Sequence, residues 1–229
     1  MNKPIKVAIL EDHQGIIDGY LYRLNQSAEI KVVATAYFGE DLEPMLSVPI
    51  DVLLMDINVP AHRDSVSPFP VLHLTRRLIQ NYPNLHILVI SMHTMQTLIQ
   101  ALVDLGISGY IFKSDSASIR QLDKIVPMIA RDGIYFSQEA YDKLRADKSL
   151  RVAPALTPRQ LEALSLCAAY PDSPTSEIAG KMDVVASTFR NLLSNAYLRL
   201  DVSTRAAAII RLQKLGLIPS AVEDEKSVS

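Results

Sequence analysis

The sequence predicts an α/β domain with a parallel sheet, followed by a smaller all-helical domain. In the first half, short apolar runs alternate five times with helical patterns. Repeated β-then-α units of this kind form parallel sheets with helices on both faces. After Leu156 the helical patterns continue without a convincing strand, and a length of 229 residues favours two modest domains over one large domain.

Apolar periodicity and turn residues give the bounds of the expected elements. Strands are expected at residues 5–10, 30–36, 51–55, 85–91 and 109–112. Helices are expected in the same half at residues 14–26, 39–47, 68–82, 94–105 and 115–132. In the second half four helices are expected, at residues 158–169, 175–182, 186–200 and 204–215. Thr157 and Pro158 form an N-cap followed by proline at the first helical position.

These elements divide the chain into four parts. We expect a sheet domain over residues 1–133, a polar linker with a short helix over 134–153, a helical domain over 154–218 and a disordered tail over 219–229. The sheet domain is acidic, since residues 1–135 carry 11 Lys/Arg and 14 Asp/Glu, whereas residues 154–219 carry 7 and 5. This asymmetry predicts different partners for the two domains.

Composition excludes several classes of protein. The net charge of −2 argues against a protein that binds polyanions by bulk charge. No apolar stretch approaches the ~18 residues of a spanning helix, and no membrane contact is expected. A single cysteine, Cys167, excludes an internal disulfide framework and a multi-cysteine zinc site. We therefore expect a cytoplasmic protein.

Carboxylates follow two of the expected strands. Glu11 and Asp12 follow the first strand and Asp56 follows the third. In a sheet of order 2-1-3-4-5 these strands are neighbours, so the three carboxylates converge at one edge. Like charges this close need a compensating cation, and clustered oxygen ligands suit Mg²⁺.

Two further strand ends carry polar side chains. Ser91 ends the fourth strand, and Lys113 follows the fifth. A hydroxyl and an ammonium group opposite a metal-bound carboxylate form a site for a phosphoryl group. A single such residue is usually a solvated loop residue, but five of them at four strand ends favour a functional site.

The first half resembles the receiver domain of two-component response regulators over about residues 4–132. Four motifs carry this resemblance: Glu11-Asp12-His13, Asp56-Ile57-Asn58-Val59-Pro60, Ser91-Met92-His93 and Gly109-Tyr110-Ile111-Phe112-Lys113. The resemblance implies a flavodoxin-like (βα)5 fold in which Asp56 accepts a phosphoryl group from a sensor histidine kinase. It also implies that Asp12, Asp56 and the backbone carbonyl of Asn58 bind Mg²⁺, with Glu11 acting through water.

The same resemblance assigns roles to three residues beside the acids. Ser91 would bind a phosphoryl oxygen, and Lys113 would pair with the phosphoryl group. Tyr110 matches an aromatic switch position, although a half-buried strand tyrosine is an equal alternative. One departure is the loop at residues 61–70, which is long, lacks glycine and is expected beside Asp56. We expect it to shield the phosphoryl group, to alter kinase recognition or to have no effect.

The second half contains a possible DNA-binding motif. The expected helices at 175–182 and 186–200, joined by a tight turn, are typical of a helix-turn-helix whose second helix enters the major groove. That helix contains no acid, and its side chains suit bases and phosphates: Ser187, Thr188, Arg190, Asn191, Ser194, Asn195 and Arg199. An ordinary helix with a polar outer face is the alternative.

Residues 154–218 resemble the LuxR-type helix-turn-helix of NarL/FixJ-class regulators. The resemblance is carried by Leu156-Thr157-Pro158-Arg159-Gln160-Leu161-Glu162, Glu177-Ile178-Ala179, Leu200-Asp201-Val202 and Ala206-Ala207-Ala208. Leu192 stands where this family usually has histidine, and the stretch 169–173 is slightly longer than usual. The resemblance implies a dimer contact through the last helix, although Ala207, Ala208, Leu212 and Leu215 fit the core of their own domain equally well. The receiver helix at 94–105 is the other candidate dimer surface.

The sequence therefore favours a regulator that is not an enzyme. Phosphorylation of Asp56 would promote a homodimer that binds promoter repeats. A Mg²⁺-dependent phosphatase is a weaker alternative, because such enzymes generally need an acid where this chain has Asn58. A regulator that works without phosphorylation, through a constitutive dimer or a partner, stays open because of the unusual loop at 61–70.

Overall fold

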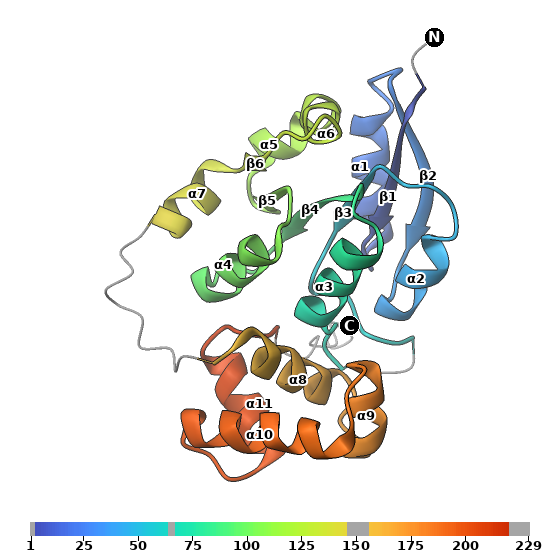
Figure 1. Ribbon diagram of the computed structural model, residues 1–229. Helices are drawn as coiled ribbons and strands as arrows, with labels where there is room; N and C mark the ends of the chain where they lie inside the picture. The colour runs from blue at the N-terminus through green and yellow to red at the C-terminus, as the bar shows by residue number, and fades with distance from the viewer. Residues whose placement is uncertain (1–2, 64–66, 146–155, 220–229) are drawn as a thin grey trace, which may run out of the picture.

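The computed structural model describes residues 3–63, 67–145 and 156–219, and the statements below concern these residues. Within them the chain folds into a sheet domain and a helical domain (Figure 1). Residues 146–153 of the expected linker and residues 220–229 of the expected tail lie outside the described part. No helix in the described part is long and apolar enough to cross a membrane.

The sheet is parallel and has the order β2-β1-β3-β4-β5-β6. Its strands are β1 (Ile5–Leu10), β2 (Ile30–Ala36), β3 (Val52–Met55), β4 (His86–Ser91), β5 (Gly109–Phe112) and β6 (Tyr135–Phe136). The predicted order of the first five strands is confirmed, and β1 lies between β2 and β3. The carboxyl ends of β1 and β3 are therefore adjacent, which places their following residues at one edge of the sheet.

The sixth strand corrects the predicted five-stranded sheet. Residues Tyr135 and Phe136 pair with Gly109 and Tyr110 in parallel register. A side chain at position 109 would collide with the backbone oxygen of Tyr135, so glycine permits this close approach. A two-residue run is too short to give an alternating pattern, which is why the sequence did not predict the strand.

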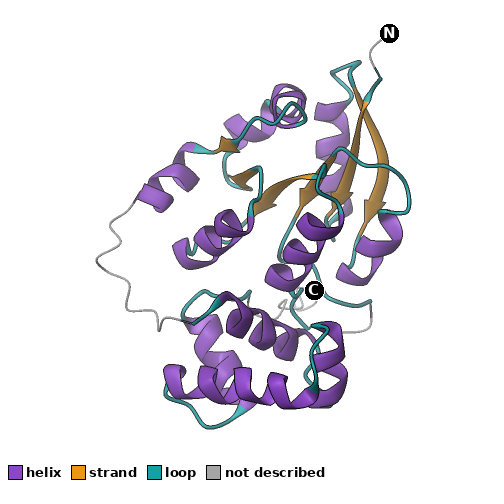
Figure 2. Cartoon of the chain, in the orientation of Figure 1, coloured by secondary structure: helices purple, strands orange, loops and turns teal. Residues whose placement is uncertain are grey.

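Helices cover both faces of the sheet (Figure 2). One apolar core joins the sheet to α2 (Leu42–Met45), α3 (Val71–Asn81), α4 (Gln96–Leu105) and α7 (Gln138–Arg145). The other core joins it to α1 (Gln14–Leu24), α5 (Ser116–Arg120) and α6 (Leu122–Ile129). A 3-10 turn, η1 (Gly39–Asp41), precedes α2.

The helix expected at 39–47 is the 3-10 turn η1 followed by the short helix α2, so only residues 42–45 are α-helical. Two further expected helices differ clearly from the prediction. Helix α3 begins at Val71 rather than at residue 68, because residues before the prolines at 68 and 70 avoid the helical conformation. The helix expected at 115–132 is two helices, α5 and α6, separated by Gln121 with φ −105° and ψ 15°.

The helical domain contains α8 (Pro158–Ala169), α9 (Thr175–Lys181), α10 (Ala186–Leu200) and α11 (Arg205–Lys214). Thr157 caps α8 through the backbone N–H of Gln160, whose side chain accepts from the backbone N–H of Thr157. The Arg205 guanidinium holds the long α8–α9 connection by donating to the carbonyl oxygens of Cys167, Tyr170 and Ser173. Burial raises the pKa of the Cys167 thiol to about 11, so this thiol is not a reactive thiolate.

A cap at the start of α5 gives a test of the sheet domain. The Asp115 carboxylate accepts from the backbone N–H groups of Ala117 and Ser118, both at 3.0 Å, and from the Ser118 hydroxyl at 2.6 Å. Asp115→Ala should lower the free energy of unfolding by about 1 kcal/mol at pH 7, measured by urea unfolding. Asp115→Ser should retain most of that stability.

The effect of Asp115→Ala should also depend on pH. The hydrogen bonds from Ser118 hold the pKa of Asp115 below its usual 3.8. A lowered carboxyl pKa stabilises the fold above the unfolded value and loses that stabilisation as pH falls through the folded value. An unchanged difference between Asp115→Ala and wild type at pH 3 and pH 7 would contradict this role.

Candidate functional site

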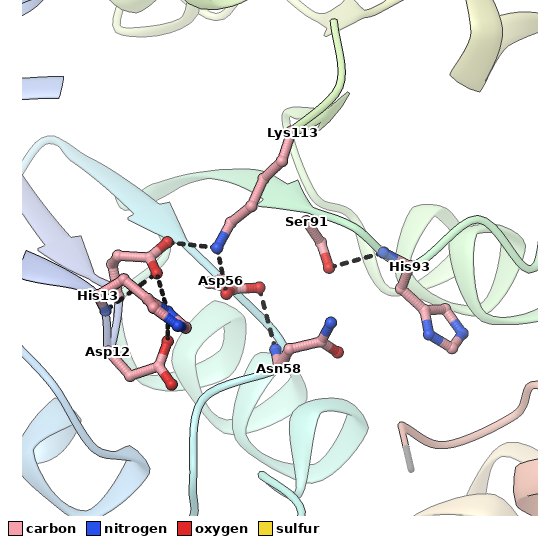
Figure 3. A network of polar contacts seen from close by, with 8 residues as sticks. Asp12, His13, Asp56, Asn58, Ser91, His93 and Lys113 are labelled. Atoms are coloured by element: carbon pink, nitrogen blue, oxygen red, sulfur yellow. Dashed lines mark hydrogen bonds and ion pairs between the residues drawn. The ribbon is translucent and has the colours of Figure 1, made fainter. Parts of the chain in front are cut away.

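The predicted acidic residues meet at the carboxyl edge of β1 and β3. Glu11 follows β1 and Asp56 follows β3, and both side chains are buried. Asp12 is next to Glu11 and is partly exposed. Asn58 lies on the same side, where its backbone N–H donates to Asp56 Oδ1 at 3.0 Å (Figure 3).

Lys113 supplies the positive charge of this cluster. It follows β5, and its Nζ lies 2.6 Å from Glu11 Oε2 and 2.7 Å from Asp56 Oδ2. Burial lowers the pKa of Lys113, but the Asp56 charge and the hydrogen bonds to both acids outweigh burial and raise it. The ammonium group is therefore charged at neutral pH and bridges two buried carboxylates.

The acids retain the chemistry of a cation site despite this bridge. Burial and the negative charge of Asp56 together raise the pKa of Glu11 above its usual value, although Lys113 and His13 act in the opposite direction. Glu11, Asp12 and His13 bring potential ligand atoms within 4.8 Å of one another. Carboxylate oxygens in such a cluster fit the ligand preference of Mg²⁺.

His13 also belongs to this site, although the sequence motif that contains it gave it no role of its own. Its Nδ1 lies 2.7 Å from Asp12 Oδ1 and 3.3 Å from Glu11 Oε1. Burial lowers the pKa of His13, but the adjacent Asp12 and Glu11 outweigh it and raise the pKa. The available signal was its position directly after the acid pair.

Ser91 and Tyr110 meet at the backbone of a third residue, His93. The Ser91 hydroxyl oxygen accepts from the backbone N–H of His93 at 3.1 Å, and the Tyr110 hydroxyl donates to the His93 carbonyl at 2.7 Å. Ser91 and Tyr110 are fully buried, and burial raises the pKa of the Tyr110 phenol. The residues after β4 are therefore tied to the two residues expected to respond to a phosphoryl group.

The unusual loop at 61–70 is held on η1 and on the helical domain. An isolated antiparallel β-bridge joins Pro60 to Pro68 across the loop. The Glu40 carboxylate accepts from the backbone N–H of Arg63 at 3.0 Å. The His62 ring packs on the Tyr170 ring, with centroids 5.1 Å apart. Residues 64–66 lie outside the described part, so the expectation that the loop shields Asp56 stays a prediction.

Helix α10 presents the expected DNA-contacting residues on one exposed surface. All seven of them are exposed: Ser187, Thr188, Arg190, Asn191, Ser194, Asn195 and Arg199. The turn between α9 and α10 contains Asp183 with φ +54°, a left-handed conformation that aspartate tolerates better than most residues. Helix α10 lies on the side of the helical domain that faces away from the sheet domain (Figure 1).

Apolar residues on α10 and α11 whose roles the sequence left open pack in or against the core of the helical domain. Leu192 is half-buried and packs against the helical core, which explains an apolar residue at this position. Ala208 and Leu212 are fully buried in the same core, so these two side chains are not available as a dimer surface. Ile210 is an exposed large apolar residue of α11.

Replacing Lys113 tests the charge balance of the site. Lys113→Met removes the ammonium group from two buried carboxylates, so the pKa of Glu11 should rise further. The pKa is measured by following the carboxyl ¹³C shift of Glu11 against pH. Lys124→Met, an exposed position on α6, is the control. An identical Glu11 titration in Lys113→Met and wild type would contradict the bridge.

Comparisons with known proteins agree with the geometry. The family model described as the response regulator receiver domain matches residues 7–125. The transcriptional regulatory protein DegU of Brevibacillus brevis is 27% identical over 93% of this chain and 95% of its own length. MctR of Rhizobium johnstonii, also a transcriptional regulatory protein, is 28% identical over 90% of this chain and 91% of its own length.

Solved structures show the same fold across both domains. RcsB from Salmonella enterica serovar Typhimurium, bound to promoter rprA with the phosphomimetic BeF3−, superposes with a TM-score of 0.61 at 19% identity. That match covers 92% of this chain and 99% of the RcsB chain. With its receiver site and its helical C-terminal domain, this chain belongs to the response regulator receiver family and has the receiver plus helix-turn-helix architecture of two-component regulators.

Proposed function

We propose that this chain is a DNA-binding regulator of transcription controlled by phosphorylation of Asp56. The observation that carries the proposal is the Lys113 ammonium group between the buried carboxylates of Glu11 and Asp56 at the edge of a receiver-type sheet. The phosphoryl donor is a sensor histidine kinase, the partner typical of receiver domains. The geometry supports a nucleophilic carboxylate with a positive charge placed beside the incoming phosphoryl group.

Phosphoryl transfer needs one bond to form and one to break. An Asp56 carboxylate oxygen attacks phosphorus, the phosphorus–nitrogen bond of the phosphohistidine breaks, and its electron pair returns to the imidazole. Lys113 pairs with the new negative charge, which is about −1.5 to −2 at neutral pH. Asp12, Asp56 and the backbone carbonyl of Asn58 would hold Mg²⁺, with Glu11 acting through water, and the ion would supply positive charge beside the transferring group.

The response to phosphorylation passes through Ser91 and Tyr110. The Ser91 hydroxyl donates to a phosphoryl oxygen, and Tyr110 adjusts its hydrogen bond with the residues after β4. This change favours a homodimer, in which two α10 helices read two half-sites of a promoter repeat. A solved structure of two RcsB dimers bound to two parallel DNAs supports this analogy at the level of fold.

Removing the phosphoacceptor tests this proposal directly. With Mg²⁺ and beryllofluoride, wild type should shift from monomer to dimer in sedimentation velocity, whereas Asp56→Ala should stay monomeric. Asp123→Ala, at a partly buried acid on α6, is the control and should behave as wild type.

The same sedimentation measurement distinguishes the proposed function from the alternative function. A dimer without beryllofluoride, unchanged in Asp56→Ala, would favour a regulator that acts without phosphorylation. His62 of the long loop contacts Glu40 and Tyr170. These contacts are the observations that favour this alternative for this chain.

A single arginine tests the DNA-binding surface. Arg190 is exposed on α10, and replacing it by alanine should weaken binding to duplex DNA and reduce the salt slope by about 0.9 for each phosphate that is no longer neutralised. Binding is measured by fluorescence anisotropy over a series of salt concentrations. Arg120→Ala, on the receiver helix α5, should leave both quantities unchanged. Equal salt slopes for Arg190→Ala and wild type would exclude Arg190 from phosphate contact.

A further inference from the structure

His13 stands at the start of α1, but its side chain does not cap that helix. It is the N-cap residue of α1, with φ −101° and ψ 111°, and its ring makes no capping hydrogen bond. Side chains that cap helices are typically those of serine, threonine, aspartate or asparagine. The ring turns instead toward the two acids that precede it in the chain (Figure 3). His13 is therefore placed to act at the acidic site and not in the helix.

Glu11 and Asp12 fix the orientation of this ring. Glu11 Oε1 accepts from the backbone N–H of His13 at 3.2 Å and lies 3.3 Å from its Nδ1, while Asp12 Oδ1 lies 2.7 Å from the same nitrogen. The other oxygen of Glu11, Oε2, is buried and lies 2.6 Å from Lys113 Nζ. Within the described residues this ion pair is its only polar contact. Glu11 therefore retains the capacity to interact with a cation.

The spacing of the three side chains fits the coordination shell of a small divalent ion. An octahedral ion with bonds of about 2.1 Å places neighbouring ligand atoms about 3 Å apart. The distances from His13 Nδ1 to the carboxylate oxygens of Asp12 and Glu11, 2.7 and 3.3 Å, lie on either side of that value. The ligand atoms of all three residues lie within 4.8 Å of one another. One ion can therefore contact the imidazole nitrogen together with a carboxylate oxygen of Asp12.

His13 lies at the solvent side of this cluster. Its side chain is 59% exposed, whereas that of Asp12 is 16% exposed and that of Glu11 is 1% exposed. A hydrated ion would thus meet the imidazole before it reaches the buried acids. Water can complete the coordination shell from the same side, as it does for divalent ions at sites with few protein ligands.

A nitrogen ligand changes which ions such a site prefers. Mg²⁺ prefers oxygen ligands and gives up its bound water reluctantly, so it gains little from an imidazole. First-row transition-metal ions bind imidazole nitrogen as well as carboxylate oxygen, and their affinities rise from Mn²⁺ to Cu²⁺. A histidine beside two acids should therefore strengthen the binding of these ions more than the binding of Mg²⁺.

We propose that His13 supplies a nitrogen ligand to the cation site and makes that site select a divalent transition-metal ion over Mg²⁺. The proposal rests on the proposed function, since the ion is the one that assists phosphorylation of Asp56. Because this ion lies beside the transferring phosphoryl group, its identity becomes an input to the regulator. The alternative role of His13 is to orient Asp12 by a hydrogen bond, without contact to the ion.

The test uses the full chain with Mn²⁺ alone as the probe. Mn²⁺ accepts the oxygen ligands of a Mg²⁺ site and is paramagnetic, so the signal of the free ion in electron paramagnetic resonance gives its Kd. Pulsed measurements of the same kind detect a nitrogen nucleus that is bonded to the ion. Wild type should show ¹⁴N coupling, and labelling with ¹⁵N-histidine should convert it to ¹⁵N coupling. The labelling does not alter the chain, so this readout is independent of any effect on folding.

His13→Asn tests the residue itself. Asparagine is a favoured N-cap residue, so the start of α1 should be retained. The histidine coupling should disappear, and the Mn²⁺ affinity should fall by about 10-fold or more, the loss typical of removing even an outer-shell partner of a metal ligand. The Mg²⁺ affinity, measured by competition with Mn²⁺, should fall much less. An oxygen-only site would give no histidine coupling in wild type.

The matched control is His86→Asn. His86 also faces a carboxylate, with its Nε2 3.7 Å from Asp132 Oδ1, but it lies at the first residue of β4, at the opposite end of the strand from Ser91. This variant should match wild type in histidine coupling and in both affinities. Histidine coupling that persists in His13→Asn would assign the nitrogen to another histidine and overturn the proposal.

Asp12→Asn separates failure of the proposal from failure of the cation site. If Mn²⁺ binding is weakened in Asp12→Asn but wild type shows no histidine coupling, the cation site stands and His13 is not a ligand. If wild type and Asp12→Asn bind Mn²⁺ equally, the ion binds elsewhere. The proposed cation site then fails, and the role of His13 fails with it.

Discussion

The buried ion bridge at Lys113 is the constraint around which the receiver domain is arranged. Two buried carboxylates at adjacent strand ends repel each other, and one positive charge from a third strand makes that arrangement stable. The bridge requires β1, β3 and β5 to end at the same edge, and the parallel sheet in its observed order provides this arrangement. The helices that connect these strands must lie on the faces of the sheet, where their apolar residues form the two cores.

Much of this arrangement could be predicted from the sequence because it depends on local patterns. The strands at 5–10, 30–36 and 109–112 have the predicted bounds, since each is an apolar run bounded by polar or turn residues. The helices at 158–169 and 186–200 also have the predicted bounds. Glu11, Asp56 and Lys113 meet as expected, because the order of a parallel sheet fixes which strand ends are neighbours.

Other features depend on contacts between distant residues and had no reliable signal. The acid at position 162 lies within an apolar stretch of α8, and nothing in the local sequence predicted that its partners include His73 and Arg76 on α3. Gly216 lies directly after a helix, where glycine is common, so the sequence did not predict its contact with Met95. The helical periodicity of Leu212 is compatible with both a core position and a dimer surface. The packing of α11 on α8 shows that Leu212 lies in the core.

The sixth strand also limits how far the helical domain can move from the receiver domain. Because β6 and α7 attach residues 135–145 to the receiver domain, only residues 146–155 connect α7 to the start of the helical domain. Even a fully extended tether of that length spans about 35 Å. A released helical domain would therefore meet its docking surface at an effective concentration in the millimolar range. At such a concentration even a weak interface between the two domains would form again after it opens.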